Sequence, residues 1–147
     1  MLADGAYIDT SALAKRYLNE PGSDEVDQFL REQRRRTISR LGVLELRCLL
    51  ARRRRAGEIS ADYERDALSE FAGDIQGAVL LVEPVVDGQV LRGRDLIERL
   101  RDHPLRALDA LHLAIAGTTG SRMIVATADR VMTRAAKELG FEVVTFG

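Results

Sequence analysis

Five carboxylates of the chain are flanked by apolar residues, although Asp and Glu are almost never buried without a partner. A half-buried carboxylate costs several kcal/mol unless it is hydrogen-bonded, paired with a cation or bound to a metal. Mg²⁺ and Mn²⁺ prefer oxygen ligands, so a cluster of such acids would suit either cation. The five are Asp9, Glu45, Glu83, Asp109 and Asp129. We expect Glu83, which precedes Pro84, to take no part in such a site.

Each of the other four acids also fits an ordinary structural role. Asp9 or Asp129 could cap the helix that follows it, and Asp109 could be a favourable charge in the first turn of a helix. Glu45 could pair with an arginine at the edge of the core. Only their convergence in space distinguishes a metal site from four separate roles.

The elements that would bring these acids together alternate between short β-type runs and longer helical patterns. Such alternation is typical of a parallel sheet wrapped by helices, an α/β fold. Strands are expected at 6–9, 36–39, 79–83, 123–127 and 142–146, and helices at 11–18, 24–33, 41–56, 61–75, 89–101, 107–116 and 130–139. No repeat or long linker interrupts the pattern, so we expect one domain over residues 1–147.

Residues typical of helix ends support these boundaries. Ser23 and Ser60 stand where helix N-caps belong. Gly57, Gly117 and Gly140 stand where glycines usually end a helix.

The acids fall near one edge of the expected sheet. Asp9 and Asp129 stand at or just past the carboxyl ends of the first and fourth strands. In open α/β sheets the ligand crevice lies at this edge, where the strand order reverses. Asp109 opens a helix and Glu45 lies in the first turns of the helix after the second strand, so both could face the same edge.

Charge and composition narrow the possible partners. With 22 Lys and Arg against 23 Asp and Glu, the formal net charge is −1, which gives no global attraction to nucleic acid or to a membrane. Arginines gather at 31–40 and 47–55, where they could hold an RNA backbone, bind acidic stretches of a partner protein, or merely face solvent. The N-terminal segment lacks a basic leader and no apolar run approaches the ~20 residues that span a bilayer, so we expect a cytoplasmic protein.

The single cysteine excludes an intramolecular disulfide and a multi-cysteine metal site. Cys48 stands among Leu46, Leu49 and Leu50, so we expect it to be a small buried residue.

Four segments, in order along nearly the whole chain, resemble the motifs of the PIN-domain family, and within it the VapC-like toxins of bacterial toxin–antitoxin systems. They are 7–13 (YIDTSAL), 43–46 (VLEL), 105–114 (LRALDALHLA) and 127–130 (TADR). The resemblance implies a three-layer fold whose five-stranded parallel sheet has the order 3-2-1-4-5, flanked by about seven helices. It also implies that Asp9, Glu45, Asp109 and Asp129 surround one or two Mg²⁺ or Mn²⁺ ions.

The resemblance further implies an RNA-cleaving enzyme that is neutralised by a small antitoxin, reaches DNA only through that antitoxin, and forms homodimers. We expect RNA hydrolysis by metal-activated water, with 5′-phosphate and 3′-hydroxyl products. Asp9, Asp109 and Asp129 are expected as direct or water-mediated ligands. Glu45 is expected either as a further ligand or as the group that orients the water.

Neighbouring polar residues have weaker assignments. Ser11 and Thr127 could hydrogen-bond the acids or a phosphate oxygen, and Arg130 could contact substrate. His112 lies three residues beyond Asp109 and could join it as a ligand, although packing in its leucine-rich context is the favoured role. Because the chain has only two histidines, a metal-free mechanism with a histidine pair is disfavoured.

Two other functions fit parts of the sequence. The same fold could serve RNA processing or DNA flap cleavage. A receiver-type signalling domain also gathers aspartates at a sheet edge, but it needs an Asp after the third strand and a Lys after the fifth. Here the third strand ends in Glu83-Pro84, and Lys137 lies in a helix before the fifth strand, which disfavours that reading.

Overall fold

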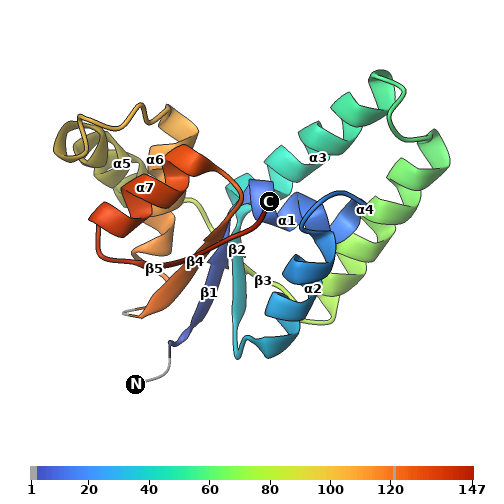
Figure 1. Ribbon diagram of the computed structural model, residues 1–147, viewed down its shortest axis with the longest axis horizontal. Coiled ribbons are helices and arrows are strands. Elements are labelled where there is room, and N and C mark those ends of the chain that lie inside the picture. Colours follow the sequence, from blue (N-terminus) through green and yellow to red (C-terminus); the bar gives the residue numbers. More distant parts are fainter. Residues whose placement is uncertain (1–2, 121) are drawn as a thin grey trace.

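The computed structural model describes residues 3–120 and 122–147. In this part of the chain five strands alternate with seven helices (Figure 1). Their bounds are β1 Gly5–Ile8, α1 Thr10–Tyr17, α2 Ser23–Glu32, β2 Arg36–Ser39, α3 Arg40–Arg55, α4 Ala61–Gln76, β3 Leu81–Glu83, α5 Asp87–Arg99, α6 Ala107–Ala116, β4 Met123–Thr127, α7 Arg130–Glu138 and β5 Glu142–Thr145.

The strands form one parallel sheet with the order β3-β2-β1-β4-β5, as the family resemblance implied. β1 is central and pairs with β2 on one side and with β4 on the other. The chain therefore reverses its direction of strand addition between β1 and β4. In open α/β sheets, ligands bind outside the carboxyl ends of the strands at such a point.

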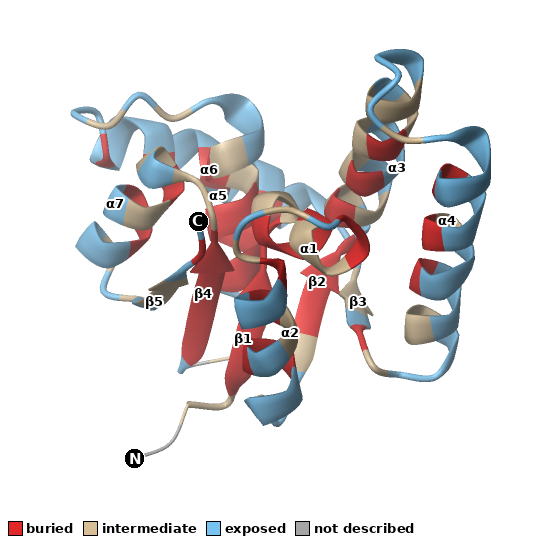
Figure 2. Ribbon diagram, turned by 45° about the vertical axis from the view of Figure 1, so that its right-hand side comes forward, coloured by how far each residue is buried: buried red, intermediate tan, exposed pale blue. Residues whose placement is uncertain are grey.

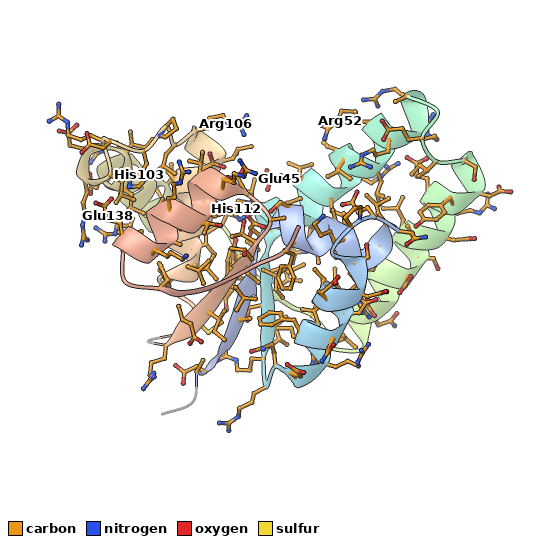
Figure 3. All side chains as sticks on the ribbon, in the orientation of Figure 1. Glu45, Arg52, His103, Arg106, His112 and Glu138 are labelled. Atoms are coloured by element: carbon orange, nitrogen blue, oxygen red, sulfur yellow. The ribbon has the colours of Figure 1, made fainter. Side chains whose placement is uncertain are left out.

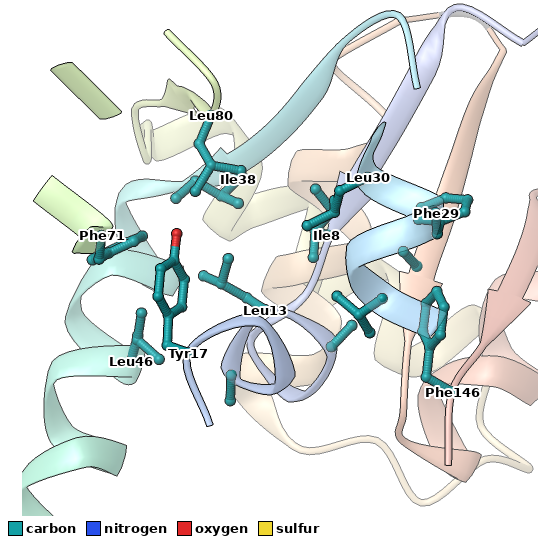
Figure 4. Close-up of a cluster of buried hydrophobic side chains, with 14 of the residues drawn as sticks. Ile8, Leu13, Tyr17, Phe29, Leu30, Ile38, Leu46, Phe71, Leu80 and Phe146 are labelled. Atoms are coloured by element: carbon teal, nitrogen blue, oxygen red, sulfur yellow. The ribbon is translucent and has the colours of Figure 1, made fainter. Parts of the chain in front are cut away.

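Alternation along the strands divides the core into two layers. Ala6 and Ile8 of β1 pack with α1 to α4, whereas Tyr7 packs on the opposite face with α5, α6 and α7. The two groups of helices lie on opposite faces of the sheet in Figure 1, and Figure 2 shows that β1, β2 and β4 are buried between them. Figure 4 shows the first layer, where side chains such as Leu13, Ile38 and Leu46 meet over β1 and β2. Residues on both faces of β1 are thus fixed by packing, which makes its carboxyl end a rigid position.

Two sequence interpretations are wrong. Ser23 is not an N-cap, because Gly22 occupies that position, while the Ser23 hydroxyl donates to the Leu18 carbonyl at 2.7 Å and closes the preceding turn. Cys48 is exposed because the buried stripe of α3 runs through Leu46 and Leu50, one turn apart, and Cys48 points away from it.

The remaining boundaries agree closely with expectation. Ser60 caps α4 by accepting from the Tyr63 amide at 3.0 Å, and Gly57 and Gly140 follow helix ends with positive φ. The third strand begins at Leu81, later than expected, because the two preceding amides donate to the Asp74 carbonyl at the end of α4. Within residues 3–120 and 122–147 there is no helix of the length and apolarity needed to cross a bilayer.

Gly5→Ala is expected to destabilise the protein by about 1–3 kcal/mol, through overpacking and backbone strain. Gly5 has φ +152°, and an added Cβ would lie 2.6 Å from the backbone oxygen of Arg35. The matched control is Gly73→Ala on α4, where an added Cβ has no neighbour within 4 Å. The control is expected to gain about 0.5–1 kcal/mol, because Ala suits a helix interior better than Gly. Denaturant unfolding measures both, and equal stability of the two variants would contradict this packing.

Candidate active site

Asp9 is a buried carboxylate at the carboxyl end of β1, with an exposure of 4%. Its Oδ1 accepts from the Ser11 hydroxyl at 2.7 Å and from the Ala12 amide at 3.1 Å, so it caps α1. Its Oδ2 accepts from the Thr127 hydroxyl at 2.6 Å. Within the described residues no Lys, Arg or His forms an ion pair with it. Three hydrogen bonds but no paired cation therefore compensate its charge.

Thr127, the last residue of β4, connects Asp9 to Asp129. Its hydroxyl donates to Asp9 and accepts from the Asp129 amide at 3.0 Å. Ser11 joins the same network, since its oxygen accepts from the Ala128 amide at 2.9 Å and lies 3.3 Å from the Thr127 hydroxyl. The Asp129 carboxylate caps α7 through Oδ1, which accepts from the Met132 amide at 2.9 Å. The two aspartates thus lie at the ends of adjacent strands, on the edge that the sequence predicted, and Thr127 binds the carboxylate of Asp9 and the backbone of Asp129. Both side chains also cap helices.

Glu45 is held from two sides by residues of other elements. Its Oε1 accepts from the Thr10 hydroxyl at 2.6 Å and lies 2.6 Å from Nε2 of His112. The other imidazole nitrogen of His112 lies 2.6 Å from the hydroxyl of Tyr7. In Figure 3 Glu45 of α3 and His112 of α6 point toward one another above the sheet. Oε2 of Glu45 has no hydrogen bond to any described residue, so it remains available at this partly exposed position, where the side chain is 24% accessible.

Asp109 and Arg130 complete the set of residues that the sequence singled out. Asp109 lies in the first turn of α6, one turn before His112, and its Oδ2 accepts from the Arg106 amide at 3.1 Å. No hydrogen bond connects it to the other three acids in the described part of the chain. Arg130 is exposed and opens α7 directly after Asp129. Glu83 ends the edge strand β3, with β2 between it and β1.

The carboxylates of the site meet part of the coordination needs of a divalent cation. Among the described residues no three His, Cys, Asp or Glu side chains stand close enough to enclose a metal by themselves. Mg²⁺ nevertheless keeps several waters in most sites and is bound through one or two carboxylates. The linked pair Asp9 and Asp129 supplies two such carboxylates, and Asp9 lacks a paired cation. These residues therefore fit a largely hydrated Mg²⁺ or Mn²⁺ ion and not a fully protein-enclosed one.

Burial and hydrogen bonding shift the pKa values of Asp9 and Glu45 in opposite directions. Burial raises the pKa of Asp9, and that rise is only partly opposed by the hydrogen bonds from Thr127, Ser11 and Ala12 and by the nearby His112. Burial also acts to raise the pKa of Glu45, but the hydrogen bonds from His112 and Thr10 outweigh it and lower that pKa. Of these two acids, Asp9 is therefore the one whose charged form is disfavoured by folding.

This difference predicts how stability depends on pH in the presence of chelator. A carboxyl whose pKa is raised by folding contributes stability below its unfolded pKa, and that contribution is lost as the pH rises through its folded pKa. Asp9→Asn is therefore expected to melt at a higher temperature than the parent at neutral pH, by a few degrees. The difference is expected to vanish in acid. Thermal melts of both proteins from pH 3 to 8 measure it, with the exposed Asp66→Asn as control; a lower melting temperature for Asp9→Asn at pH 7 would oppose the assignment.

The sequence interpretation underestimated His112, which it favoured as a packing residue. The residue is buried, yet each of its ring nitrogens contacts a polar group, one on Tyr7 and one on Glu45. Thr10 was not singled out at all, although it follows Asp9 directly. Two features of the sequence could have indicated these roles. His112 stands one turn after Asp109 in an otherwise apolar helix, and the hydroxyl residue Thr10 stands beside Asp9.

Four of the ten arginines at 31–40 and 47–55 have contacts within the described part of the fold. Arg47 and Arg54 of α3 both pair with Glu64 of α4, at 3.2 and 2.7 Å. Arg53 pairs with Glu20 at 3.4 Å, and Arg36 donates to the carbonyls of Leu30 and Gln33 at the end of α2 and of Val79 before β3. These four side chains fasten helices and strands, so they are poor candidates for holding RNA.

The PIN domain family model matches residues 6–138. With this match over most of its length, the chain belongs to the PIN-domain family. Ribonuclease VapC46 of Mycobacterium tuberculosis is 36% identical over 140 residues, which cover 94% of this chain and 95% of the relative. Ribonuclease VapC47 of the same species is 32% identical over 141 residues, 92% of each. Within the PIN family the chain is thus one of the VapC-type ribonucleases, as its motifs predicted.

Solved structures share the fold. VapC20 of Mycobacterium tuberculosis, described as a sarcin-ricin loop cleaving toxin, matches with a TM-score of 0.72 over 95% of this chain and 98% of its own, at 18% identity. FitAcB from Neisseria gonorrhoeae matches with a TM-score of 0.68 over 95% of this chain and 96% of its own, also at 18% identity. PAE2754 from Pyrobaculum aerophilum matches at 0.60 over 95% and 83%, with 17% identity. Such similarity confirms the predicted architecture.

Proposed function

We propose that this ribonuclease holds Mg²⁺ or Mn²⁺ with Asp9, Asp129, Asp109 and Glu45, and that it hydrolyses RNA there. The observation that carries the proposal is the Thr127 hydroxyl, which donates to the carboxylate of Asp9 at the end of β1 and accepts from the backbone amide of Asp129 after β4. Two aspartates 120 positions apart thus follow the adjacent strands β1 and β4, at the point where strand order reverses, and share Thr127 as a hydrogen-bond partner. If the two aspartates served only as helix caps, they would not need to share Thr127 as a partner.

The proposed reaction is hydrolysis at one phosphodiester. A bound divalent cation supplies charge neutralisation at the phosphate and a water of lowered pKa. In the hydrolysis, the oxygen of a water molecule would bond to phosphorus as the bond to the leaving 3′ oxygen breaks. One proton of the water would pass to Glu45 and the 3′ oxygen would take a proton from solvent, so the products would carry a 5′-phosphate and a 3′-hydroxyl.

The chain's own residues orient these groups. Thr10 and His112 fix Glu45 through Oε1, which leaves Oε2 to accept a proton from the attacking water. Ser11 and Thr127 fix both oxygens of Asp9, and the helix-capping bond fixes Asp129. Such supporting hydrogen bonds hold ligands in the geometry that the reaction needs.

The biological role follows from the relatives. We place the chain as the toxin of a type II toxin–antitoxin pair that inhibits growth by cutting RNA in the cytoplasm. A cognate antitoxin neutralises it and provides any contact with DNA. The whole chain, 1–147, acts as one nuclease domain and pairs with a second copy as a homodimer.

The test is to incubate the purified chain with total RNA in Mn²⁺, in Mg²⁺ and in chelator, and to map the new ends. Cleavage only with metal, leaving 5′-phosphates, is expected. Equal cleavage in chelator would remove the metal mechanism. The same assay with a DNA flap distinguishes the alternative nuclease role, since cutting of DNA but not of RNA would overturn the toxin assignment.

A further inference from the structure

One face of α7 carries three cations in a row. Arg130, Arg134 and Lys137 are spaced four and three residues apart, and all are exposed. Residues at such spacing lie on the same side of a helix. At 1.5 Å per residue the row is about 10 Å long, roughly the length of three stacked nucleotides at about 3.4 Å each.

The three cations line a single hollow of about 630 Å³. The hollow begins at Ala128 and Asp129, beside the candidate active site, and its far wall is the end of β5 with residues 145–147. Asp129, one of the proposed metal ligands, lines the hollow itself, so the row of cations borders the proposed site. Asp129 is the one acidic side chain among its lining residues.

Unlike several arginines of α3, these cations are not used by the fold. Arg47, Arg53 and Arg54 all pair with acids. By contrast, no acid of the described residues lies within ion-pair distance of the α7 row. An unpaired row of positive charge next to an acidic site suits a polyanion that must approach that site, particularly in a chain with a net charge of −1.

We propose that this α7 groove, formed by Arg130, Arg134 and Lys137, binds the phosphodiester backbone of the RNA strand beside the scissile bond. The inference rests on the proposed function. Guanidinium groups bind phosphate oxygens in pairs, while an ammonium group acts as a point charge. The groove contacts backbone and presents no exposed aromatic ring for base stacking, so it contributes affinity without sequence preference.

The test compares two double variants in chelator, using a fluorescent single-stranded RNA 12-mer. Arg134→Gln/Lys137→Gln removes two charges of the α7 groove. The control, Arg92→Gln/Arg99→Gln, removes two exposed charges from α5 that line a separate hollow of about 300 Å³. We expect the α7 pair to raise Kd about tenfold and to reduce the slope of log Kd against log salt by about 1.4, because each single-strand phosphate contact contributes about 0.7. The control is expected to change neither quantity.

Several results would contradict RNA binding by the α7 groove. Equal effects of the two double variants, or an unchanged salt slope in the α7 pair, would overturn the groove while leaving the ribonuclease intact. The groove is also overturned if the α7 pair keeps its RNA affinity but loses affinity for the antitoxin. An Arg134→Lys variant is expected to keep the parent slope, and circular dichroism reports whether each variant is folded. A parent protein that neither binds nor cuts RNA would instead refute the proposed function.

Discussion

Replacing Asp9 by Asn is expected to lower the rate of RNA cleavage by more than about 100-fold, since even residues that only support a metal ligand cost about 10–100-fold. The substitution keeps the size of the side chain and lets its oxygen accept from Ser11 and Ala12, as now. It removes the charge that the fold leaves without a paired cation. Initial rates of RNA cleavage at saturating Mn²⁺ measure the effect.

Asp66→Asn on the exposed face of α4 is the control for this experiment, and we expect it to cut RNA at the parent rate. A folded Asp9→Asn protein with more than a tenth of the parent rate would remove Asp9 from the proposed metal ligands. Together, the cleavage rate and the melting temperature in chelator distinguish a loss of catalysis in Asp9→Asn from a loss of folding stability. The variant is expected to be inactive and yet at least as stable as the parent, because it no longer buries an ionised carboxyl.

Replacement of His112 is expected to have the second largest effect, a fall in kcat of roughly 10–100-fold with little change in KM, because His112 positions Glu45 rather than substrate. Its Nε2 contacts Oε1 of Glu45 and its Nδ1 contacts the hydroxyl of Tyr7, both at 2.6 Å. Steady-state kinetics on an RNA oligonucleotide separate the two constants.

Substitution of His112 by Gln or by Asn distinguishes its contact with Glu45 from its contact with Tyr7. A Gln side chain places its NH₂ near the position of Nε2 and can still donate to Glu45, whereas the shorter Asn reaches only toward Tyr7. We therefore expect His112→Gln to keep more activity than His112→Asn. Tyr7→Phe, which removes the partner of Nδ1, is expected to have an intermediate effect. Equal kcat values for the Gln and Asn variants would show that the contact with Glu45 does not carry the effect.

The fold was predictable because its signals are local and repeated. Short apolar runs alternate with helical periodicity, and caps such as Ser60 and Gly57 mark the boundaries. The positions of Asp9 and Asp129 followed from the same reading, since residues after parallel strands meet at one edge of the sheet. Predictions failed where a local pattern was ambiguous. Cys48 is surrounded by leucines in sequence, but the orientation of α3 turns it toward solvent.

The hydrogen bonds of the site could not be predicted in the same way. Contact between His112 and Glu45 joins residues 67 positions apart on different helices, and contact between Tyr7 and His112 crosses 105 positions. These contacts depend on how α3 and α6 are placed above the sheet, which periodicity does not specify. For the same reason, the sequence did not show which arginines form ion pairs within the fold. Arg54 differs from Arg134 only in having Glu64 across from it once α3 and α4 pack.

The central claim is that Asp9 and Asp129 share one divalent cation. Its most direct test is a crystal of the protein soaked in Mn²⁺, with anomalous difference density collected at the manganese edge. The account predicts a peak between the two carboxylates, bound to them directly or through one water, and its absence in Asp9→Asn. A strong peak elsewhere, with both aspartates still bonded only to Ser11, Thr127 and their helix amides, would contradict it.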